Sequence, residues 1–451
     1  MRLLVYFTSE RLFTAFSDLG YIVEIKRFYP NVRFVCMKHN SVWQPPSTIN
    51  DSSFDIEFIT ENNINKRFGK FVLDFFTYVH REVSVSFQTK IRIEAKIPIN
   101  KTISLKTFVL QFKLRWILIS ILGLVFLKKI ARVILPYLAD NFFSNRIISK
   151  NFVPECLLLI SGGPFSNVEN STIYHAHKLH VKCALIVDNW DNLSSKSIIW
   201  RKPDLMGVWG PNMLNDAIDI HGIREKTIST IGSSRMCEYS QHTQRESIPY
   251  VLFAGSSSDI GEIELIQISL KVLRESGIKL LYRPHPVSNK RRSVDLTRLN
   301  PSVLSGDLEI VQEADFYSFQ SLSSLMDQCK SAAFVIASHS TVIVESLFLG
   351  KQVVSFSRIE SPYFYNNNLW NGYKHLQELN DNVNLRICSD LDEFYDKIRD
   401  LTIEFKSGLL NKSDLNFVPE ILPDFQNSYR ERIIEFIHKL AKSSNKSLRL
   451  P

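Results

Sequence analysis

Short apolar runs alternate with amphipathic segments along most of the chain, and the alternation forms two successive arrays. The runs are continuous stretches of Val, Ile and Leu, which is typical of parallel strands that carry helices on both faces. Strands that alternate with helices in this way predict a doubly wound α/β domain, so two arrays predict two such domains. The length of 451 residues agrees, because it exceeds what one hydrophobic core usually supports.

The two arrays meet in residues 236–249, a polar stretch without apolar periodicity. We therefore expect an N-terminal domain over residues 1–240 and a C-terminal domain over 241–425, followed by a helix and tail over 426–451. The strands expected in the first array cover residues 2–7, 21–28, 32–37, 155–161, 181–188, 205–210 and 226–232. Those expected in the second array cover residues 250–255, 278–284, 308–313, 332–337 and 352–356, with helices over 260–276 and from 322 and 341 onward.

One segment of the first array, residues 90–150, carries most of the positive charge. It holds twelve Lys or Arg residues against two acids, a net charge of +10, whereas the whole chain carries +8. We expect a basic helical insert here, and two interpretations stay open. Its surface can contact the anionic cytoplasmic face of a membrane, or its longest apolar run, 116–127, is a core helix with a solvated basic face. That run is too short to span a bilayer, which takes roughly twenty residues, and no nucleic-acid-binding motif accompanies the charge.

The six cysteines indicate a reducing compartment. They are widely spaced and form no C-x-x-C pair, so we expect neither a disulfide framework nor a zinc site. The first residues lack the basic stretch, apolar run and small-residue cleavage site of a secretion signal. We therefore expect a cytoplasmic protein, peripheral on the inner face of the cytoplasmic membrane if the basic insert binds lipid.

Two strands of the second array end in turns that carry anion-binding residue types. Arg283 and His285 lie at the end of one expected strand. Ser338, Ser340 and Thr341 lie between another strand and the helix after it. Ligands of open α/β sheets bind beyond the carboxyl ends of the strands, and a helix N-terminus there attracts anions. The expected anion is a diphosphate, which Arg283 can bind bidentately, and His285 is also a candidate catalytic residue that can donate to it. Helix capping explains the hydroxyls equally well.

Three further residues of this domain fit such a site. Glu345 lies four residues after Thr341 on the same helical face, among apolar neighbours. Gly255 and Ser256 belong to a third turn between a strand and a helix, where a phosphate or a base can approach the backbone closely. A flexible loop explains this Gly-Ser turn about as well.

Three stretches carry a family resemblance: residues 187–235, the sequence RPHP at 283–286 and the sequence SHSTVIVESLFLGK at 338–351. They resemble bacterial glycosyltransferases of the GT-B fold that serve surface polysaccharide assembly, which are distantly similar to CDP-glycerol glycerophosphotransferases and polysialyltransferases. The resemblance implies two Rossmann-like domains that face each other across a cleft. It also implies a nucleotide-sugar donor in the C-terminal domain, with the acid at position 345 on the ribose hydroxyls, and a glycan or lipid-linked acceptor in the N-terminal domain.

Two long polar turns of the first array are candidates for the acceptor side, because catalytic groups often lie on loops held by a rigid scaffold. Asp191 and Asp188 are candidate bases for an acceptor hydroxyl in an inverting reaction, and Asp191 is preferred because it lies further into its loop. Trp190 can stack on a sugar ring. A loop cap and a tryptophan at a domain interface are the open alternatives. The predicted acceptor-binding residues are Gly163, Trp190, Asn192 and Lys196.

We expect no metal site and no cofactor apart from the nucleotide sugar, which is the donor substrate. No D-x-D pair lies in a plausible loop, and His175 and His177 are two apart on an expected helix, so they cannot share a metal. His221 is interpreted as a helix-end residue before Gly222.

The leading function is a glycosyltransferase that moves a sugar from a nucleotide donor to a glycan or lipid-linked acceptor in capsule, O-antigen or lipopolysaccharide assembly. The alternatives are a sugar-nucleotide 2-epimerase of the same fold, a polyol-phosphate transferase of the CDP-glycerol type, and a catalytically silent binding protein.

Overall fold

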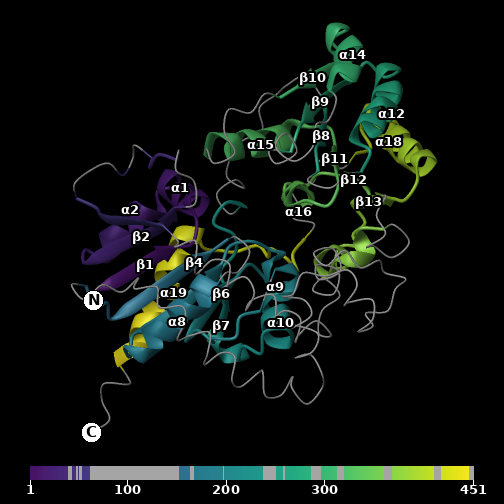
Figure 1. Ribbon diagram of the computed structural model, residues 1–451. Helices are drawn as coiled ribbons and strands as arrows, with labels where there is room; N and C mark the ends of the chain where they lie inside the picture. Colours follow the sequence, from purple (N-terminus) through teal and green to yellow (C-terminus); the bar gives the residue numbers. More distant parts are fainter. Residues whose placement is uncertain are drawn as a thin grey trace, which may run out of the picture. The chain divides into compact units, whose positions relative to one another are not determined.

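The computed structural model describes residues 1–38, 43–46, 49, 53–60, 152–162, 167–196, 198–236, 250–256, 260–285, 296–311, 319–359, 368–410 and 418–445. These residues form two compact units (Figure 1). The first unit contains the chain up to Glu238 and from Glu420 on, and the second contains the chain from Tyr239 to Pro419. The basic segment 90–150 and Gly163 lie outside the described residues. Within the described ranges, no helix is long and apolar enough to cross a membrane.

The first unit is built on a seven-stranded sheet in the order β3-β2-β1-β4-β5-β6-β7, and all neighbouring strands are parallel. The strands are β1 (Leu3–Phe7), β2 (Val32–Lys38), β3 (Asp55–Thr60), β4 (Cys156–Ser161), β5 (Lys182–Val187), β6 (Leu205–Val208) and β7 (Ile228–Thr230). The helices described with them are α1 (Glu10–Asp18), α2 (Tyr21–Phe28), α8 (Asn167–Lys178), the short α9 (Asn192–Ser195), α10 (Pro211–Asp219) and α19 (Tyr429–Asn445). Strands β1 and β4 are buried over their whole length, as expected of central strands covered on both faces.

The second unit is built on a six-stranded sheet in the order β10-β9-β8-β11-β12-β13, again with parallel neighbours throughout. The strands are β8 (Tyr250–Ala254), β9 (Lys279–Arg283), β10 (Leu308–Ile310), β11 (Val335–Ala337), β12 (Val353–Phe356) and β13 (Leu385–Cys388). Its helices include α12 (Glu262–Arg274), α14 (Asn300–Leu304), α15 (Phe319–Ser331), α16 (Thr341–Phe348), α17 (Lys374–Gln377) and α18 (Leu391–Lys406).

Both sheets reverse their strand order at one place. In the first unit, β2 and β3 follow β1 toward one edge of the sheet, and β4 then pairs with the other side of β1. In the second unit, β9 and β10 follow β8 in the same way, and β11 pairs with the other side of β8. Ligands of doubly wound sheets bind beyond the carboxyl ends of the strands at such a switch point. The predicted pair of doubly wound domains is therefore confirmed, and each has one favoured location for a ligand.

Residues 21–28 were expected to form a strand, and that prediction is wrong, because they form helix α2. Short apolar runs are ambiguous between strand and helix. Tyr21, Ile22 and Ile25 are buried at helical spacing, whereas Val23 and Phe28 are about half exposed. Gly20 precedes the helix with a φ of +77°, a left-handed conformation that allows the sharp turn out of α1.

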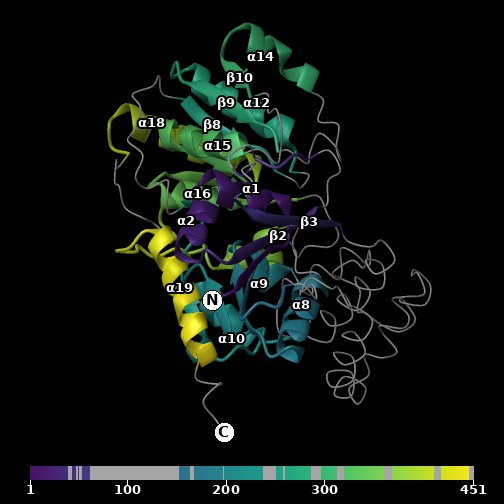
Figure 2. The same cartoon turned by 90° about the vertical axis from the view of Figure 1, so that its left-hand side faces the viewer.

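The C-terminal helix α19 returns to the first unit. It occupies the region where apolar periodicity predicts a helix. It packs on β4 and β5, and also on α2, which lies about four hundred residues earlier in the chain. Figure 2 shows α19, in yellow, beside α2, in purple. The ring of Tyr429 lies 5.1 Å from that of Tyr21, and the Arg432 Nε donates to the Ile231 carbonyl at 2.9 Å. A helix from the C-terminal part of the chain thus covers part of the sheet of the first unit.

Asp204, before β6, joins the edges of β5 and β6. Its carboxylate accepts hydrogen bonds from the Cys183 N–H (2.9 Å) and the Lys182 Nζ (3.1 Å), and the His177 Nε2 lies 3.2 Å away. Burial alone would raise the pKa of Asp204, but these partners outweigh it and lower the pKa from 3.8 to about 2. Asp204 therefore stabilises the fold in its ionised form.

We expect Asp204→Asn to lower the free energy of unfolding at pH 7 by about 2 kcal/mol. Because the folded-state pKa is depressed, this contribution is present above the unfolded-state value and is lost as the pH falls from about 4 through about 2. Urea unfolding at pH 7 and pH 3 checks this, with the exposed Asp219→Asn as control. Equal stability of the two variants at pH 7 would contradict the assignment.

Candidate functional site

In the second unit, the ends of β8 and β9 approach each other very closely. The Gly255 N–H donates to the Arg283 carbonyl at 2.9 Å, continuing the pairing of Ala254 with Arg283. A Cβ on Gly255 would lie 2.8 Å from the backbone nitrogen of His285 and 3.3 Å from the Arg283 carbonyl oxygen. Only glycine fits this position without displacing the backbone. The structure therefore brings the predicted residues Gly255, Arg283 and His285 together at the carboxyl edge of the sheet.

The turn after Gly255 already contains a carboxylate. The Ser256 N–H donates to Oε1 of Glu262, the first residue of α12, and the Tyr282 hydroxyl donates to Oε2 at 2.7 Å. Ser256 and Glu262 are both buried. Burial and the neighbouring Glu262 carboxylate raise the pKa of Tyr282, so its hydroxyl stays a donor. Sequence reasoning missed Glu262, although an acid in the first turn of a helix that follows a strand was a signal for it.

Arg283 is held by helix α15. It is 6% exposed, and its Nη1 donates to the Gln328 Oε1 at 2.7 Å and to the Ser324 Oγ at 3.4 Å. As predicted, this candidate phosphate-binding arginine lies at the end of a strand, and its hydrogen bonds to α15 fix the Nη1 group. A fixed guanidinium presents its remaining N–H groups in one direction, which favours bidentate binding of a phosphate.

The turn between β11 and α16 is fixed by its serines. The Ser338 Oγ accepts the Phe356 N–H at 3.1 Å and so joins β11 to β12, and the Ser340 Oγ accepts the Val342 N–H at 3.2 Å as the N-cap of α16. Between them His339 has a φ of +49° and packs its ring 4.7 Å from that of Tyr373. The capping interpretation thus holds for Ser340. Thr341, the first residue of α16, lies half-buried beside it.

Glu345 and Arg283 lie around the same buried thiol. Glu345 is 3% exposed in α16, which packs on α15. Burial and the negative charge of Glu345 raise the pKa of Cys329 in α15 to about 12. The positive charge of Arg283 acts in the opposite direction and lowers this pKa. Glu345 and Arg283, two of the predicted donor-binding residues, therefore both lie within electrostatic range of Cys329 in α15.

In the first unit, Asp188 forms hydrogen bonds that join two turns of the fold. It follows β5, it is 2% exposed, and its two carboxylate oxygens accept the Ser234 N–H at 3.2 Å and the Ser234 hydroxyl at 2.6 Å. Burial raises the pKa of Asp188, whereas the Arg235 charge and the bonds from Ser234 lower it. Both oxygens of this candidate base are engaged with the turn that follows β7.

Asp191 lies nearer to solvent and forms an ion pair. Its side chain is 14% exposed, and its Oδ2 lies 2.8 Å from the Lys196 Nζ and accepts the Ser195 hydroxyl at 3.0 Å. The structure thus brings two predicted residues, Asp191 and Lys196, together at the two ends of α9. Trp190 is 4% exposed and Asn192 is fully buried, so both belong to the support of this loop.

The switch point of the first unit carries two acids that sequence reasoning did not select for the site. Glu10 begins α1 directly after β1 and is 1% exposed. Glu169 of α8 is equally buried and accepts the Ser161 hydroxyl of β4 at 2.8 Å. The signal for Glu10 was a hydroxyl-rich turn with an acid after the first strand. Across the described residues, no group of three or more His, Cys, Asp or Glu side chains could hold a metal ion.

Neither a protein-family model nor a curated protein matches the chain, but solved structures do. A Listeria monocytogenes protein assigned as a UDP-N-acetylglucosamine 2-epimerase is similar with a TM-score of 0.52 and 9% identity, over 98% of this chain and 97% of its own. MnaA of S. aureus, solved with UDP, has a TM-score of 0.50 and 9% identity over 98% and 97%. The lipopolysaccharide outer core galactosyltransferase WaaB has a TM-score of 0.46 and 8% identity over 97% and 99%. The first two similarities confirm the GT-B class of fold, with two Rossmann-like domains.

Proposed function

We propose that this protein is a nucleotide-sugar-dependent glycosyltransferase. The second unit binds the nucleotide-activated donor at the switch point between β8 and β11, and the first unit binds a glycan or lipid-linked acceptor. The observation that carries the proposal is the strand order β9-β8-β11. It places Arg283, at the end of β9, and the capped N-terminus of α16, which follows β11 and carries Glu345 one turn further in, on the two sides of β8. This placement combines a cation and helix amides for a diphosphate with an acid for ribose hydroxyls.

The donor half stabilises the leaving nucleotide. Negative charge develops on the diphosphate as the bond to the sugar breaks, and donors that are already in place stabilise that charge without reorganising. Arg283 is such a donor because Gln328 and Ser324 fix its guanidinium before any ligand binds. His285, two residues further, is positioned by the close approach of its backbone to Gly255 and can donate to the same diphosphate or to the sugar.

The acceptor half supplies a base. In an inverting reaction the acceptor hydroxyl attacks the anomeric carbon as its proton leaves, and Asp191 takes that proton. Of the two candidate aspartates, Asp191 is favoured because its carboxylate is partly exposed and pairs with Lys196, whereas both oxygens of Asp188 are engaged with Ser234. The ion pair with the Lys196 ammonium, at 2.8 Å, holds the Asp191 carboxylate in one orientation.

A sugar-nucleotide 2-epimerase is the second candidate. The structure that is similar with a TM-score of 0.52 belongs to a protein assigned as a UDP-N-acetylglucosamine 2-epimerase. A protein with this fold is therefore compatible with an epimerase activity. An epimerase converts its nucleotide sugar without an acceptor. It therefore has no use for an acceptor base on the loop of α9.

Incubation of the purified chain with a panel of nucleotide sugars, with and without glycan and lipid-linked acceptors, tests the proposal. A transferase releases nucleotide in proportion to acceptor, whereas an epimerase yields an isomerised nucleotide sugar with none present. Isomerisation without transfer would replace the first proposal by the second. Failure to bind any nucleotide or nucleotide sugar in calorimetry would contradict both.

The basic segment 90–150 supports a peripheral site of action on the cytoplasmic face of a membrane, where a lipid-linked acceptor is found. Its net charge of +10 complements anionic lipid, at about 1 kcal/mol for each basic residue near the surface. Vesicles containing phosphatidylserine should carry the protein upward in a flotation gradient at low salt, and less of it at high salt. Flotation should fall when Lys128, Lys129 and Arg132 are replaced by Glu, and unchanged flotation of that variant would contradict a membrane role.

A further inference from the structure

His221 is a buried histidine outside the residues assigned to the site. It follows α10, lies before Gly222 and is 2% exposed. Its ring has a backbone partner at each nitrogen: the Ile199 N–H donates to Nδ1 at 3.1 Å, and Nε2 lies 2.7 Å from the Leu193 carbonyl oxygen. The sequence offered only a helix-end role for this residue, but both of these partners lie more than twenty positions away.

These two partners define the protonation state of the ring. A backbone N–H can only donate, so Nδ1 has to be unprotonated, and a carbonyl can only accept, so Nε2 has to carry the hydrogen. His221 is therefore inferred to be a neutral imidazole in the Nε2–H form. Neither the other tautomer nor the imidazolium ion can make both bonds.

The ring joins the two ends of one loop segment. Leu193 belongs to α9, between Asp191 and Lys196, and Ile199 follows that helix by a few residues. The same segment is held from its other side by Asn170 of α8, whose Oδ1 accepts the N–H groups of Trp200 (2.9 Å) and Arg201 (3.1 Å).

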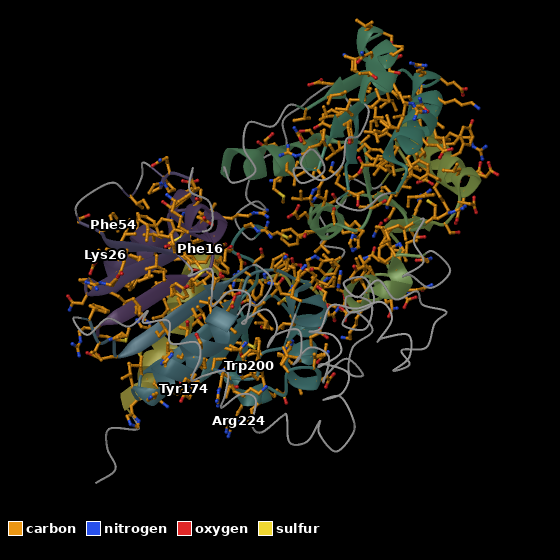
Figure 3. The ribbon with its side chains drawn as sticks, viewed as in Figure 1. Phe16, Lys26, Phe54, Tyr174, Trp200 and Arg224 are labelled. Carbon is orange, nitrogen blue, oxygen red and sulfur yellow. The ribbon has the colours of Figure 1, made fainter. Side chains whose placement is uncertain are left out.

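The side chains next to this segment are also in contact with α8. Figure 3 shows Trp200 and Tyr174 in the same part of the first unit, and the Arg201 guanidinium lies 4.9 Å from the Tyr174 ring centre. The Lys202 ammonium adds hydrogen bonds to the carbonyls of Ile199 and His221. The loop that carries Asp191 is therefore held between α8 on one side and His221 on the other.

We propose that His221 is a positioning residue for the Asp191 and Lys196 pair, an inference that rests on the proposed transferase function. A base on a loop is efficient only when the loop holds it in place, because a displacement of about 1 Å can cost a hundredfold in rate. Within α9, the Ser194 and Ser195 hydroxyls bond the Asp191 carbonyl, but those contacts move together with the loop. His221 connects α9 to the body of the unit.

Two conservative substitutions test the two hydrogen bonds of the His221 ring one at a time. In His221→Asn the side-chain oxygen can take the place of Nδ1 and accept the Ile199 N–H, while the bond to Leu193 is lost. In His221→Gln the longer amide reaches the place of Nε2 and can donate to Leu193, while the bond to Ile199 is lost. His180→Asn is a matched control, because His180 is exposed in the same unit and its φ of +56° suits asparagine.

The first measurement is steady-state transfer with the full chain. We expect kcat to fall about 10- to 100-fold in His221→Asn, with the donor KM unchanged because the donor site lies in the other unit, and no change in His180→Asn. Unchanged kcat in both His221 variants would overturn the proposal. So would a donor KM that rises in step with the fall in kcat, because that indicates general damage.

The second measurement does not depend on the reaction. In uniformly ¹⁵N-labelled protein, the ring signal of His221 is assigned as the one that disappears in His221→Asn. Long-range ¹⁵N–¹H correlation should show that this ring is in the Nε2–H form. Amide hydrogen exchange at Ile199 should be faster in His221→Gln and near wild type in His221→Asn. An Nδ1–H ring, or equal exchange at Ile199 in all variants, overturns the positioning role. If the wild type transfers no sugar yet shows these signatures, the proposed function fails and the loop anchor stands.

Discussion

Replacement of Asp191 by Asn is expected to lower the rate of sugar transfer by about 10² to 10⁴-fold, the usual contribution of a general base. The amide keeps the size of the carboxylate and can still accept the Ser195 hydroxyl, but it cannot take a proton from the acceptor. Loss of the ion pair with Lys196 should cost less than about 1 kcal/mol of stability, because both side chains are partly exposed. The measurement is kcat with saturating donor and acceptor, beside nucleotide affinity, which should not change.

Asp188→Asn is the matched comparison, and it should behave in the opposite way. Asp188 is buried and accepts hydrogen bonds from the backbone N–H and the hydroxyl of Ser234. Asn at this position can keep only one acceptor, so its NH₂ group has to lie against the Ser234 Oγ, which would then accept instead of donate, and the charge-assisted bond is lost. We expect a loss of about 1–3 kcal/mol of unfolding free energy and a smaller effect on kcat. If Asp188→Asn loses transfer activity while retaining its stability, and Asp191→Asn does not, the assignment of the base is reversed.

Replacement of Glu345 by Gln is expected to weaken binding of the nucleotide by about 10- to 100-fold. A carboxylate can accept hydrogen bonds from both ribose hydroxyls, and a hydrogen bond to a charged group contributes about 1.5–3 kcal/mol. Gln is preferable to Ala, because Glu345 is 3% exposed and its truncation would leave a cavity against α15. Calorimetric titration with the nucleoside diphosphate and with the matching free base measures the effect.

The exposed Glu275→Gln is the control for this variant, because it removes the same charge from the second unit at the C-terminal end of α12, the end opposite to the strand ends that form the site. Binding of the free base should be the same in both variants, since the ribose contact is absent from that ligand. Wild-type affinity for the nucleoside diphosphate in Glu345→Gln would show that the acid does not contact the ribose.

Most strands were predictable because a buried parallel strand is a local property of the sequence. Continuous apolar runs marked β1, β4, β5, β8 and β9, each within a few residues of its observed bounds. The prediction failed at residues 21–28, where an apolar run is short and its helical face is recognisable only once α19 packs against it. Strand β3 was not predicted, because as an edge strand its side chains stay largely exposed.

Several individual contacts of the candidate site were not predictable, because they join residues far apart in the chain. Ser340 as a cap and Glu345 on the inner face of α16 follow from spacing along one helix, which the sequence contains. The bond from Ser234 that occupies Asp188 spans 46 positions, and the contact of His221 with Leu193 spans 28. The bond of Arg283 to Gln328 spans 45 positions.

The sequence by itself determined the class of fold and the strand ends that carry polar residues, because apolar periodicity and residue type act over a few positions. Only the tertiary structure decided which of those ends meet. The return of the chain to place β11 beside β8 puts Gly255, Arg283 and Glu345 in one region, and a different strand order would separate them. The tertiary structure also decided which aspartate is buried with both carboxylate oxygens bonded to Ser234, Asp188, and which is partly exposed, Asp191. A buried carboxylate has to find hydrogen-bond donors wherever the packing supplies them, and for Asp188 that was the turn after β7.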